Sequence, residues 1–564
     1  MEDIAPYLAR NRDPIQVKSA ADVQWDATAD VVVVGFGGSG MAAAIEAREQ
    51  GASVIALDRF GGGGSTSVSG GIIYAGGTEF QKQAGFDDTS EEMFKYLKAE
   101  GVAVDDETLR TFCEGSAGDI SWLQKHGLKF GSNAFLDKTN YPPEGSWLYY
   151  SGNEKLYADR AKPAPRGHRP VGTGFSGQYI TAALGPSALA LGVELIKHAP
   201  VERLVVDAAG AVLGVKALRM DEAHWAAHSK LNSIVDPWRP FNNKRAETAI
   251  AEAIQLEAQG KPIFIRATNG VILTAGGFIY NRRMVSSHQP VVGRALMNTV
   301  RLGTMGDDGS GIELGVSAGA GTRQLSHISI ARTIAPPDAF AHGVLVNSDG
   351  ARFVNEAAYA TVVGGAIARQ GKDGEAWLIL DGPDFWAGFK WALHPPKGMF
   401  FAWAAPVLLN ILLGGARRAR SVEKLASKIG VDPVGLSETI QKVRRAARGV
   451  TPDEFGKSAT QLASFEGHSF FALNVSTRNK FAPAITMSTG GLAIDERTGA
   501  VIRPDGTVIE GLHAAGRSAV GLISNGFVSG LAIADVIFGG RRAGRNAALG
   551  SDATPANSHN LSGG

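Results

Sequence analysis

Three glycines at the end of an apolar run carry the clearest chemical signal in the sequence. Residues 31–34 are all valine and lead into Gly35, Gly37 and Gly40, which have the G-x-G-x-x-G spacing. Each glycine meets a different steric demand: a tight turn, close approach of a pyrophosphate to the backbone, and close packing of a helix on the strand. The phosphates then lie against the free N–H groups of a helix N-terminus. The spacing therefore predicts a dinucleotide-binding site.

An acidic residue follows at the distance that such a site requires. Residues 53–57 read as a second apolar strand, which ends in Asp58, and residues 41–47 read as the helix between the two strands. A carboxylate at this place accepts a hydrogen bond from a ribose hydroxyl. The Gly/Ser-rich segment 61–71 comes next. Because linkers rarely interrupt a compact nucleotide-binding unit, we expect its amides to wrap the far end of the cofactor.

Composition excludes several classes of protein. The chain has 564 residues, of which 44% are apolar, and its formal net charge is +1. Its length suggests several domains or one large α/β enzyme with an insertion. The near-neutral charge argues against nucleic acid as a partner. The single cysteine, Cys113, excludes an intramolecular disulfide framework, and we expect no metal site. Residues 1–25 lack an apolar signal segment, so we expect a cytoplasmic protein.

The other segments predict elements that position these residues. Two stretches end in glycine-rich turns as the first strand does, which suggests further contacts with the dinucleotide. The expected elements are helices within 85–130, a strand pair over 201–215, helices over 221–257 interrupted at 235–241, a strand at 270–275, a Gly/Asp loop before a helix at 306–320 with Asp307 and Asp308 as caps, a strand pair over 343–356 that presents Glu356 and Tyr359, helices over 422–448, and a strand–glycine–helix block over 489–535.

Residues 385–420 differ from the rest of the chain. Aromatic residues precede a short apolar run that is interrupted by Pro406 and Asn410, with Lys390, Lys397 and three arginines nearby. The run is too short to span a bilayer. It suits either an element lying in a membrane interface, or a hydrophobic lid or buried core helix, and the sequence leaves these open.

These blocks together resemble the fumarate-reductase-type flavoproteins. The resemblance is carried by the N-terminal glycines, by residues 270–278, 306–320 and 351–356, and by 511–535. It implies an α/β fold, in which a Rossmann-type FAD-binding domain of the GR2 type is interrupted by an α+β catalytic domain. The implied domains are FAD-binding over 1–285 and 483–548 and catalytic over 286–482, with a disordered tail at 549–564. The implied cofactor is non-covalent FAD.

Within that superfamily the chain is similar to the bacterial 3-ketosteroid dehydrogenases, especially the Δ4-(5α) type. The matching stretches are residues 69–77, 84–88, 113–116 and 164–168. The family's catalytic tyrosine falls on Tyr359, and its C-terminal Tyr-x-Ser-Gly falls on Phe527, Val528, Ser529 and Gly530. A phenylalanine thus stands where the family has a tyrosine.

The resemblance implies FAD-dependent dehydrogenation of a 3-ketosteroid, with hydride passing to flavin N5 and the α proton to a Tyr/Ser relay. The alternatives are a Δ1-dehydrogenase, a fumarate- or urocanate-type ene-reductase, and a flavoprotein without catalysis. The Pro-Tyr and Tyr-x-Gly-Pro-Gly motifs of the Δ1 enzymes are absent, and residues 357–363 lack the arginine of fumarate reductases. The implied partners are a hydrophobic steroid and an unidentified electron acceptor. The interfacial interpretation of residues 385–420 adds the inner face of the cytoplasmic membrane as a peripheral contact.

The residues expected at the site fall into two groups. The catalytic group is Tyr359, Ser529, Phe527 and Gly530. The cofactor-binding group is Gly35, Gly37, Gly38, Ser39, Gly40, Asp58, Arg59, Ser65, Thr66, Ser69, Gly70, Gly71, Val205, Ala275, Gly276, Gly277, Asp308, Gly309, Gly516, Arg517, Gly530, Leu531 and Ala532.

Overall fold

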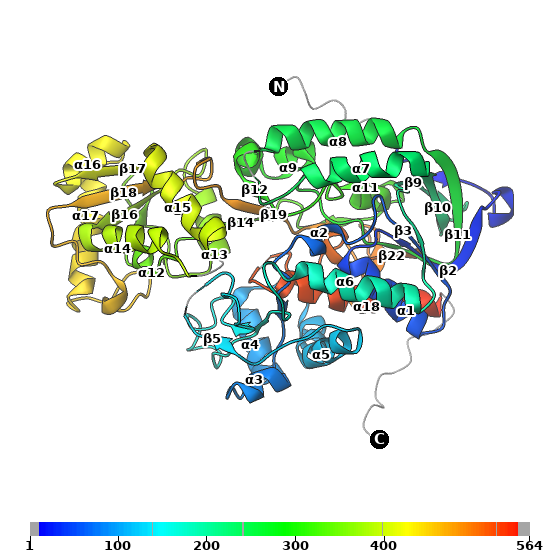
Figure 1. The fold of residues 1–564 in the computed structure, drawn as a ribbon, viewed down its shortest axis with the longest axis horizontal. Helices are drawn as coiled ribbons and strands as arrows, with labels where there is room; N and C mark the ends of the chain where they lie inside the picture. The colour runs from blue at the N-terminus through cyan, green and yellow to red at the C-terminus, as the bar shows by residue number, and fades with distance from the viewer. Residues whose placement is uncertain (1–10, 138, 240–241, 397–398, 526, 551–564) are drawn as a thin grey trace.

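A computed structural model describes residues 11–550, except 138, 240–241, 397–398 and 526. The chain forms a larger lobe, built around a wide sheet, and a smaller lobe made from residues in the yellow part of the chain (Figure 1). The expected tail over 549–564 lies outside the described residues from 551 onward, as do Lys397 and Gly526.

The larger lobe is organised around a nine-stranded sheet. The strand order is β1(Ile15–Gln16), β9(Val201–Val206), β10(Val212–Arg219), β11(Lys261–Leu273), β2(Ala27–Val34), β3(Val54–Leu57) and β8(Glu194–Ile196), with β22(Val508–Ala514) also paired to β11 and β21(Ala500–Ile502) paired to β22. Strands β11, β2, β3 and β8 run parallel, and the valines of β2 are almost fully buried. The glycine-rich turns after β2 and β11 therefore meet at one edge of the sheet.

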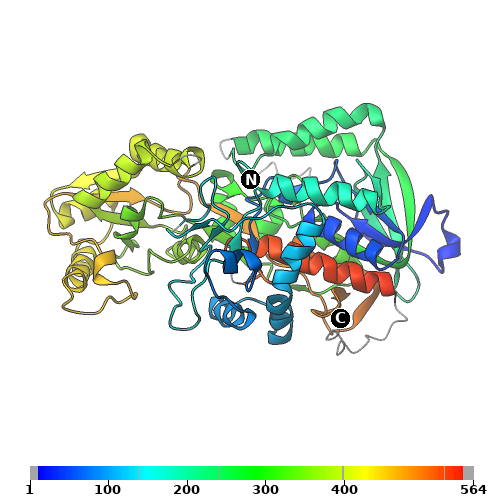
Figure 2. The same cartoon turned by 60° about the horizontal axis from the view of Figure 1, so that its bottom comes forward.

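Helices cover both sides of this sheet. On one side, α1(Gly38–Glu49) packs between α18(Leu531–Leu549) and α6(Gly177–Ala190), and Figure 2 shows α18 running beside α1. The two helices pack closely because Gly540 and Gly544 face α1: an added Cβ would lie 2.6 Å from Ser39 O and 2.2 Å from Ala43 O. On the other side lie the paired helices α7(Glu222–Ile234) and α8(Asn243–Glu257) (Figure 1).

The segment between β3 and α6 forms a smaller substructure below the sheet. Its elements are α2(Gly64–Ser67), β4(Ile73–Tyr74), α3(Glu79–Gln83), α4(Ser90–Glu100), α5(Asp106–Lys125), β5(Ala134–Phe135), β6(Leu148–Tyr149) and β7(Gly167–His168). Arg166 and Asp88 form a fully buried ion pair of 2.7 Å within it, and burial lowers the pKa of His168 to about 4. These residues of the matching stretches thus stabilise the substructure.

A three-stranded sheet connects the two lobes. It consists of β12(Val300–Arg301), β19(Ile485–Ser488) and β14(Ile328–Ala331). Beyond it the smaller lobe contains a sheet in the order β15(Val344–Val346), β16(Trp377–Asp381), β18(Phe470–Asn474), β17(Ala416–Ala419). Its helices are α12(Asp338–Ala341), α13(Ala360–Ala368), α14(Gly382–Leu393), α15(Ala405–Asn410), α16(Val422–Ile429) and α17(Pro433–Ala447).

Two expectations differ from the structure. The segment after residue 285, expected to open the catalytic domain, instead packs into the core of the larger lobe through α9(Arg282–His288), α10(Pro290–Ala295) and α11(Ser310–Ser317). Residues 351–356 also form no second strand: β15 pairs with β16, and only a single bridge joins Val346 to Arg352. Glu356 is buried and forms ion pairs of 2.7 Å with Arg352 and 2.6 Å with Lys457.

Candidate active site between the two lobes

A cavity of about 600 Å³ opens at the carboxyl ends of β2, β3 and β11, and we call it the dinucleotide cavity. Glycine is required where the chain turns beside it. Gly35 has φ +99°, and a Cβ there would lie 2.7 Å from Thr274 O. A Cβ on Gly40 would lie 1.9 Å from Gly35 O. These contacts agree with the first and third steric demands of the glycine motif.

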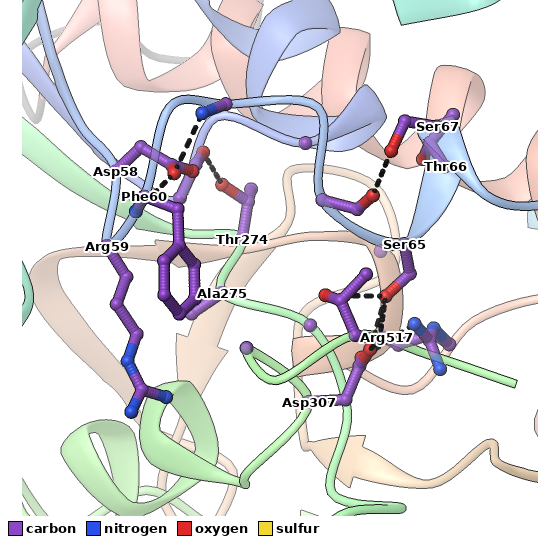
Figure 3. Close-up of a pocket in the computed structure, with 18 of the residues that line it drawn as sticks. Asp58, Arg59, Phe60, Ser65, Thr66, Ser67, Thr274, Ala275, Asp307 and Arg517 are labelled. Atoms are coloured by element: carbon purple, nitrogen blue, oxygen red, sulfur yellow. Dashed lines mark hydrogen bonds and ion pairs between the residues drawn. The ribbon is translucent and has the colours of Figure 1, made fainter. Parts of the chain in front are cut away.

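Asp58 lies at one end of this cavity with Arg59 and Phe60 (Figure 3). Its carboxylate accepts hydrogen bonds of 2.8, 2.8 and 3.0 Å from the backbone N–H groups of Phe36, Phe60 and Gly62. Asp58 therefore fixes the two loops that frame the cavity, in addition to facing it.

Arg59 is held by two acids. Its guanidinium forms ion pairs of 2.6 Å with Glu257 and 2.9 Å with Asp308. Burial alone would raise the pKa of Asp308, but the positive charges of Arg59 and Arg12 hold it below its usual value. Because both acids pair with it, Arg59 is a fixed wall of the cavity.

A second polar cluster lies at the other end of the view in Figure 3, where Ser65, Asp307 and Arg517 gather. Asp307 accepts a very short hydrogen bond from the Ser65 hydroxyl, forms a 2.6 Å ion pair with Arg517 and accepts 2.8 Å bonds from Gly277 N and Thr304 N. The expected helix-capping role for Asp307 was therefore wrong, because its carboxylate links four segments. Asp308 precedes Gly309, the N-cap residue of α11, and accepts a hydrogen bond from Ser310 N at 2.9 Å.

The residues at this cavity fit FAD. The Ser39 hydroxyl is buried at the start of α1 and has no hydrogen-bond partner among the described residues, so a phosphate oxygen could accept from it. The dinucleotide cavity also continues into a second cavity of about 210 Å³, with which it shares Ser65, Thr66 and Arg517. A long cofactor can therefore extend from the sheet edge to the region between the lobes.

The second cavity, which we call the hydroxyl cavity, lies between the lobes. Tyr359, at the start of α13, comes from the smaller lobe, while Phe527, Ser529 and Gly530 come from the larger lobe. Gly530 is the left-handed N-cap of α18. The structure thus brings together all four expected catalytic residues, although about 170 residues of sequence separate Tyr359 from the other three.

Hydrogen bonds fix the hydroxyl groups in this cavity. Asn153 Oδ1 accepts from Tyr359 N at 2.7 Å, and the Tyr149 hydroxyl donates to Ser529 Oγ at 2.7 Å. Burial raises the pKa of Tyr359, a hydrogen bond with Ser529 opposes this, and the nearby Glu154 adds to it. Ser529 therefore lies between two buried tyrosines, which is an arrangement that can pass a proton along hydroxyl groups.

A buried acid lies behind the tyrosines. Glu154 is almost fully buried and accepts from the Tyr74 hydroxyl at 3.2 Å and from Gly152 N at 2.8 Å. Burial raises the pKa of Glu154 to about 7.

Most of the expected cofactor-binding residues line one of the two cavities. Those that do are Gly35, Gly37, Gly38, Ser39, Asp58, Arg59, Ser65, Thr66, Ser69, Gly70, Gly71, Ala275, Gly276, Asp308, Gly516, Arg517, Gly530 and Ala532. The exceptions are Gly40, Val205, Gly277, Gly309 and Leu531. Val205 is fully buried within β9, paired with Ile15 and Gly214, and residues 199–201 line the cavity in its place.

The other exceptions support the site from behind. Gly277 donates to Asp307, and Gly309 N donates to Gly277 O at 2.9 Å, which holds the turn before α11. Leu531 is fully buried as the first residue of α18, in contact with the core of the larger lobe. Gly40 permits helix–strand packing, as its spacing predicted.

Sequence reasoning missed several residues that line or support the cavities. Tyr149 ends β6 and Asn153 lies in the loop after it, where the sequence predicted no element, and Trp238 lies in the break between the two helices of 221–257. Trp238 lines both cavities, and Trp403 lines the hydroxyl cavity. An aromatic residue in a Pro-containing break was the one available signal for Trp238.

Proteins of known function are similar to this chain in sequence and in fold. A family profile described as "FAD binding domain" matches residues 30–530. The chain is 37% identical over 515 residues to the "3-oxo-5-alpha-steroid 4-dehydrogenase" of Comamonas testosteroni, covering 89% of this chain and 95% of the relative. It is 25% identical over 532 residues to the "Fumarate reductase (cytochrome)" of Shewanella frigidimarina, covering 92% of this chain and 77% of that one.

A solved structure agrees. The 3-ketosteroid-delta4-(5alpha)-dehydrogenase of Rhodococcus jostii RHA1, in complex with 4-androstene-3,17-dione, superimposes with a TM-score of 0.77 at 29% identity, covering 95% of this chain and 99% of that chain. The fold and the FAD cofactor expected from sequence are thereby confirmed. The chain is an FAD-dependent oxidoreductase and belongs to the FAD-binding family that contains the 3-oxosteroid dehydrogenases and the fumarate reductases.

Proposed function

We propose that this enzyme dehydrogenates a 3-ketosteroid, introducing a C=C bond conjugated to the ketone, between C4 and C5. The observation that carries the proposal is the hydroxyl cavity, in which Tyr359 and Ser529 face apolar walls next to the dinucleotide cavity. The identity to a 3-oxo-5-alpha-steroid 4-dehydrogenase over nearly the whole of both chains supports the choice of substrate class.

The reaction breaks two C–H bonds, removing a proton from C4 and a hydride from C5, and forms the double bond. When bound, FAD supplies the two-electron acceptor for the hydride. The residues that would hold it are the glycine turn after β2, Ser39 and the Ser65–Asp307–Arg517 cluster.

The protein's own groups supply the proton side. We assign Tyr359, in its deprotonated form, to accept the C4 proton. The Ser529 hydroxyl donates to the Tyr359 oxygen and stabilises that form, and the Tyr149 hydroxyl donates in turn to Ser529. The N-terminus of α18 at Gly530 directs backbone dipoles toward the cavity and can stabilise the developing enolate at the ketone oxygen. Phe527 contributes no donor, so the neighbouring hydroxyl groups and amides must provide any hydrogen bond made there.

The fumarate-type alternative lacks a proton-donating cation at the expected place. The two cations nearest to residue 356, Arg352 and Lys457, are ion-paired with Glu356 and line neither cavity. An arginine used as proton donor would have to reach the reacting carbons.

Turnover of a saturated 5α-3-ketosteroid with an artificial electron acceptor tests the proposal. We expect consumption of the acceptor together with a conjugated enone, and mass and NMR analysis of the product places the new bond. A Δ1 product would contradict the Δ4 assignment. Turnover of fumarate or urocanate with a reduced dye, without turnover of any 3-ketosteroid, would overturn the proposed function.

We also propose that the smaller lobe contacts the inner face of the cytoplasmic membrane. No helix among the described residues has both the length and the apolar character needed to cross a bilayer. The segment 385–420 nevertheless exposes large apolar side chains beside exposed cations, as expected of an interfacial element. These side chains are Trp386, Leu393, Phe400, Leu412 and Leu413, with Arg417, Arg418 and Arg420.

A further inference from the structure

A third cavity, of about 200 Å³, adjoins the hydroxyl cavity, and we call it the arginine cavity. The two cavities share five lining residues: Trp238, Ala331, Thr333, Trp403 and Ile485. Each cavity alone is smaller than the ~300–1,000 Å³ of typical small-molecule sites, whereas the two together fall within that range. A ligand whose ketone lies at Tyr359 and Ser529 can therefore continue past the two tryptophans into the arginine cavity.

The walls of the arginine cavity are mostly apolar, and Arg332 is the one charged side chain among its described lining residues. The apolar side chains come from the smaller lobe and from the segments that connect the lobes, including Phe340, Leu378, Val407, Leu473 and Val475. Arg332 directly follows β14 and is only 4% exposed, and the polar side chains of Thr333 and Asn410 also line the cavity.

The guanidinium of Arg332 is incompletely satisfied. It donates to Ser476 O at 2.9 Å and, by a very short bond, to Ala482 O. Its Nε is buried without a hydrogen-bond partner, and no carboxylate among the described residues lies within ion-pair distance of it. Burial lowers the pKa of Arg332 to about 10, so that the side chain stays cationic at neutral pH.

Arg301 and Arg542 also bury an Nε without a hydrogen-bond partner, but neither of them lines one of the three cavities. Arg169 also lacks a carboxylate partner, but its guanidinium donates to the Ser176 hydroxyl and to four backbone carbonyls, so all five of its N–H groups are used. Arg332 has only two acceptors. A buried charge is normally paired or fully hydrogen-bonded, because removing it from water is costly. The vacant donor of Arg332 therefore calls for an acceptor that enters the cavity.

We propose that the arginine cavity receives a carboxylate at the end of the side chain of the steroid substrate, with Arg332 as its partner. The proposal rests on the proposed function, which places the ketone in the hydroxyl cavity. Arginine binds carboxylates through charge-assisted and often paired hydrogen bonds. A carboxylate fits better than a phosphate, because a single cation among apolar walls leaves a dianion undercompensated. The apolar walls match the aliphatic side chain that carries the carboxylate.

The first experiment needs no variant. The FAD-loaded enzyme is assayed with an artificial electron acceptor and three saturated 3-ketosteroids: one with a carboxylate-ended C17 side chain, its methyl ester, and the C17 ketone. We expect kcat/KM for the acid to exceed that for the ester by roughly tenfold to a hundredfold, as for a hydrogen bond to a charged group. Equal values for acid and ester would overturn the inference and leave the proposed function intact.

Variants locate the effect. Arg332→Gln should reduce the acid-to-ester ratio toward one, and Arg332→Lys should retain part of it. The matched control is Arg445→Gln, since Arg445 is an exposed arginine of α17 that lines none of the three cavities, and the ratio should not change. An unchanged ratio in Arg332→Gln would overturn the assignment of Arg332.

Two further measurements keep the inference testable if Arg332→Gln does not fold. Ala405→Leu fills the arginine cavity from α15 and should raise KM for the acid and ester more than for the C17 ketone; equal increases would count against the inference. Equilibrium dialysis measures binding of the labelled steroid acid and of its ester to the oxidised enzyme. Tighter binding of the acid, lost in Arg332→Lys/Ala405→Leu, supports the site even if no 3-ketosteroid is turned over, whereas equal binding of both overturns it.

Discussion

The Tyr149 hydroxyl, at the end of β6, donates to Ser529 Oγ, just before the start of α18, at 2.7 Å. Ser529 is thereby placed between Tyr149 and Tyr359, two tyrosines whose pKa values burial raises. A hydroxyl in this position can accept from one tyrosine while donating to another, so the three groups act as a unit. Tyr149 acts through Ser529 and is a positioning residue.

Removing any member of this hydroxyl chain should therefore slow the proton transfer. We expect Tyr359→Phe and Ser529→Ala each to lower kcat by roughly a hundredfold or more with little change in KM, because general acid–base groups contribute about that much in the transition state. Steady-state kinetics with a saturated 3-ketosteroid measures this. Turnover close to wild type in both variants would remove the assignment and leave the flavoenzyme without a named acid or base.

Tyr149→Phe should lower kcat in the same direction, and its effect should not add to that of Ser529→Ala in the double variant, because the two groups share one interaction. The control is Tyr150→Phe, which removes the neighbouring hydroxyl and leaves both cavities unchanged. Fully additive effects would mean that Tyr149 only supports the fold.

Phe527→Tyr should raise turnover. The tyrosine ring would stand 6.5 Å, centre to centre, from that of Tyr359 and would supply a hydroxyl where this chain has none. A donor to a developing enolate is typically worth about 3 kcal/mol, or roughly a hundredfold in rate, of which neighbouring donors already provide a part. We therefore expect a gain of roughly tenfold in kcat. A fall in kcat would show that Phe527 is needed for its shape.

The purified protein should be yellow and should release FAD, and not FMN, on acid precipitation. We expect release because the residues at the dinucleotide cavity are assigned to bind FAD without a covalent bond. Gly40→Val should abolish FAD binding, since a Cβ at Gly40 would lie 1.9 Å from Gly35 O. Chromatography of the supernatant identifies the flavin. Flavin that stays in the acid pellet would contradict the non-covalent assignment.

Membrane contact by residues 385–420 predicts that the protein sediments with anionic lipid vesicles. Leu412→Ser/Leu413→Ser should reduce sedimentation, because both side chains are strongly exposed apolar groups. Leu412 is 69% exposed and Leu413 51%, compared with 53% for Trp386. The matched control is Val450→Ser, an exposed valine outside the segment. If the intact protein never sediments with vesicles, only the role of this segment as a cavity wall remains. Trp403 lines both the arginine and the hydroxyl cavity, and residues 405–407, 409 and 410 line the arginine cavity.

Glu154 predicts a pH-dependent stability. Its folded-state pKa of about 7 lies above the ordinary value of 4.5, so its contribution is fully present below pH 4.5 and is lost as the pH rises through 7. The shift corresponds to about 3 kcal/mol. Glu154→Gln, which cannot ionise, should therefore gain thermal stability over the wild type as the pH is raised from 4.5 to 8. A constant difference in Tm across this range would contradict the assignment.

The sequence by itself determined the FAD-binding part of the protein. Gly35, Gly40 and Asp58 follow one another within a single βαβ unit, where local steric demands decide both the residue types and their spacing. The resemblance extended this to the family and to Tyr359 and Ser529. It could not supply Asp307, because two adjacent acids before a helix look alike in sequence and only the fold decides which one meets Ser65 and Arg517.

The tertiary structure decided how the catalytic groups are supported and what the cavity can hold. Tyr149 is hydrogen-bonded to Ser529, which lies 380 residues away in the sequence. Arg332, Trp238 and Val407 come from three separate segments and line the same cavity. Such long-range contacts depend on how the lobes and loops pack against one another, and the periodicity of helices and strands does not predict them. The vacancy at Arg332 Nε is likewise a property of packing, because no local pattern distinguishes an arginine with two acceptors from one with five.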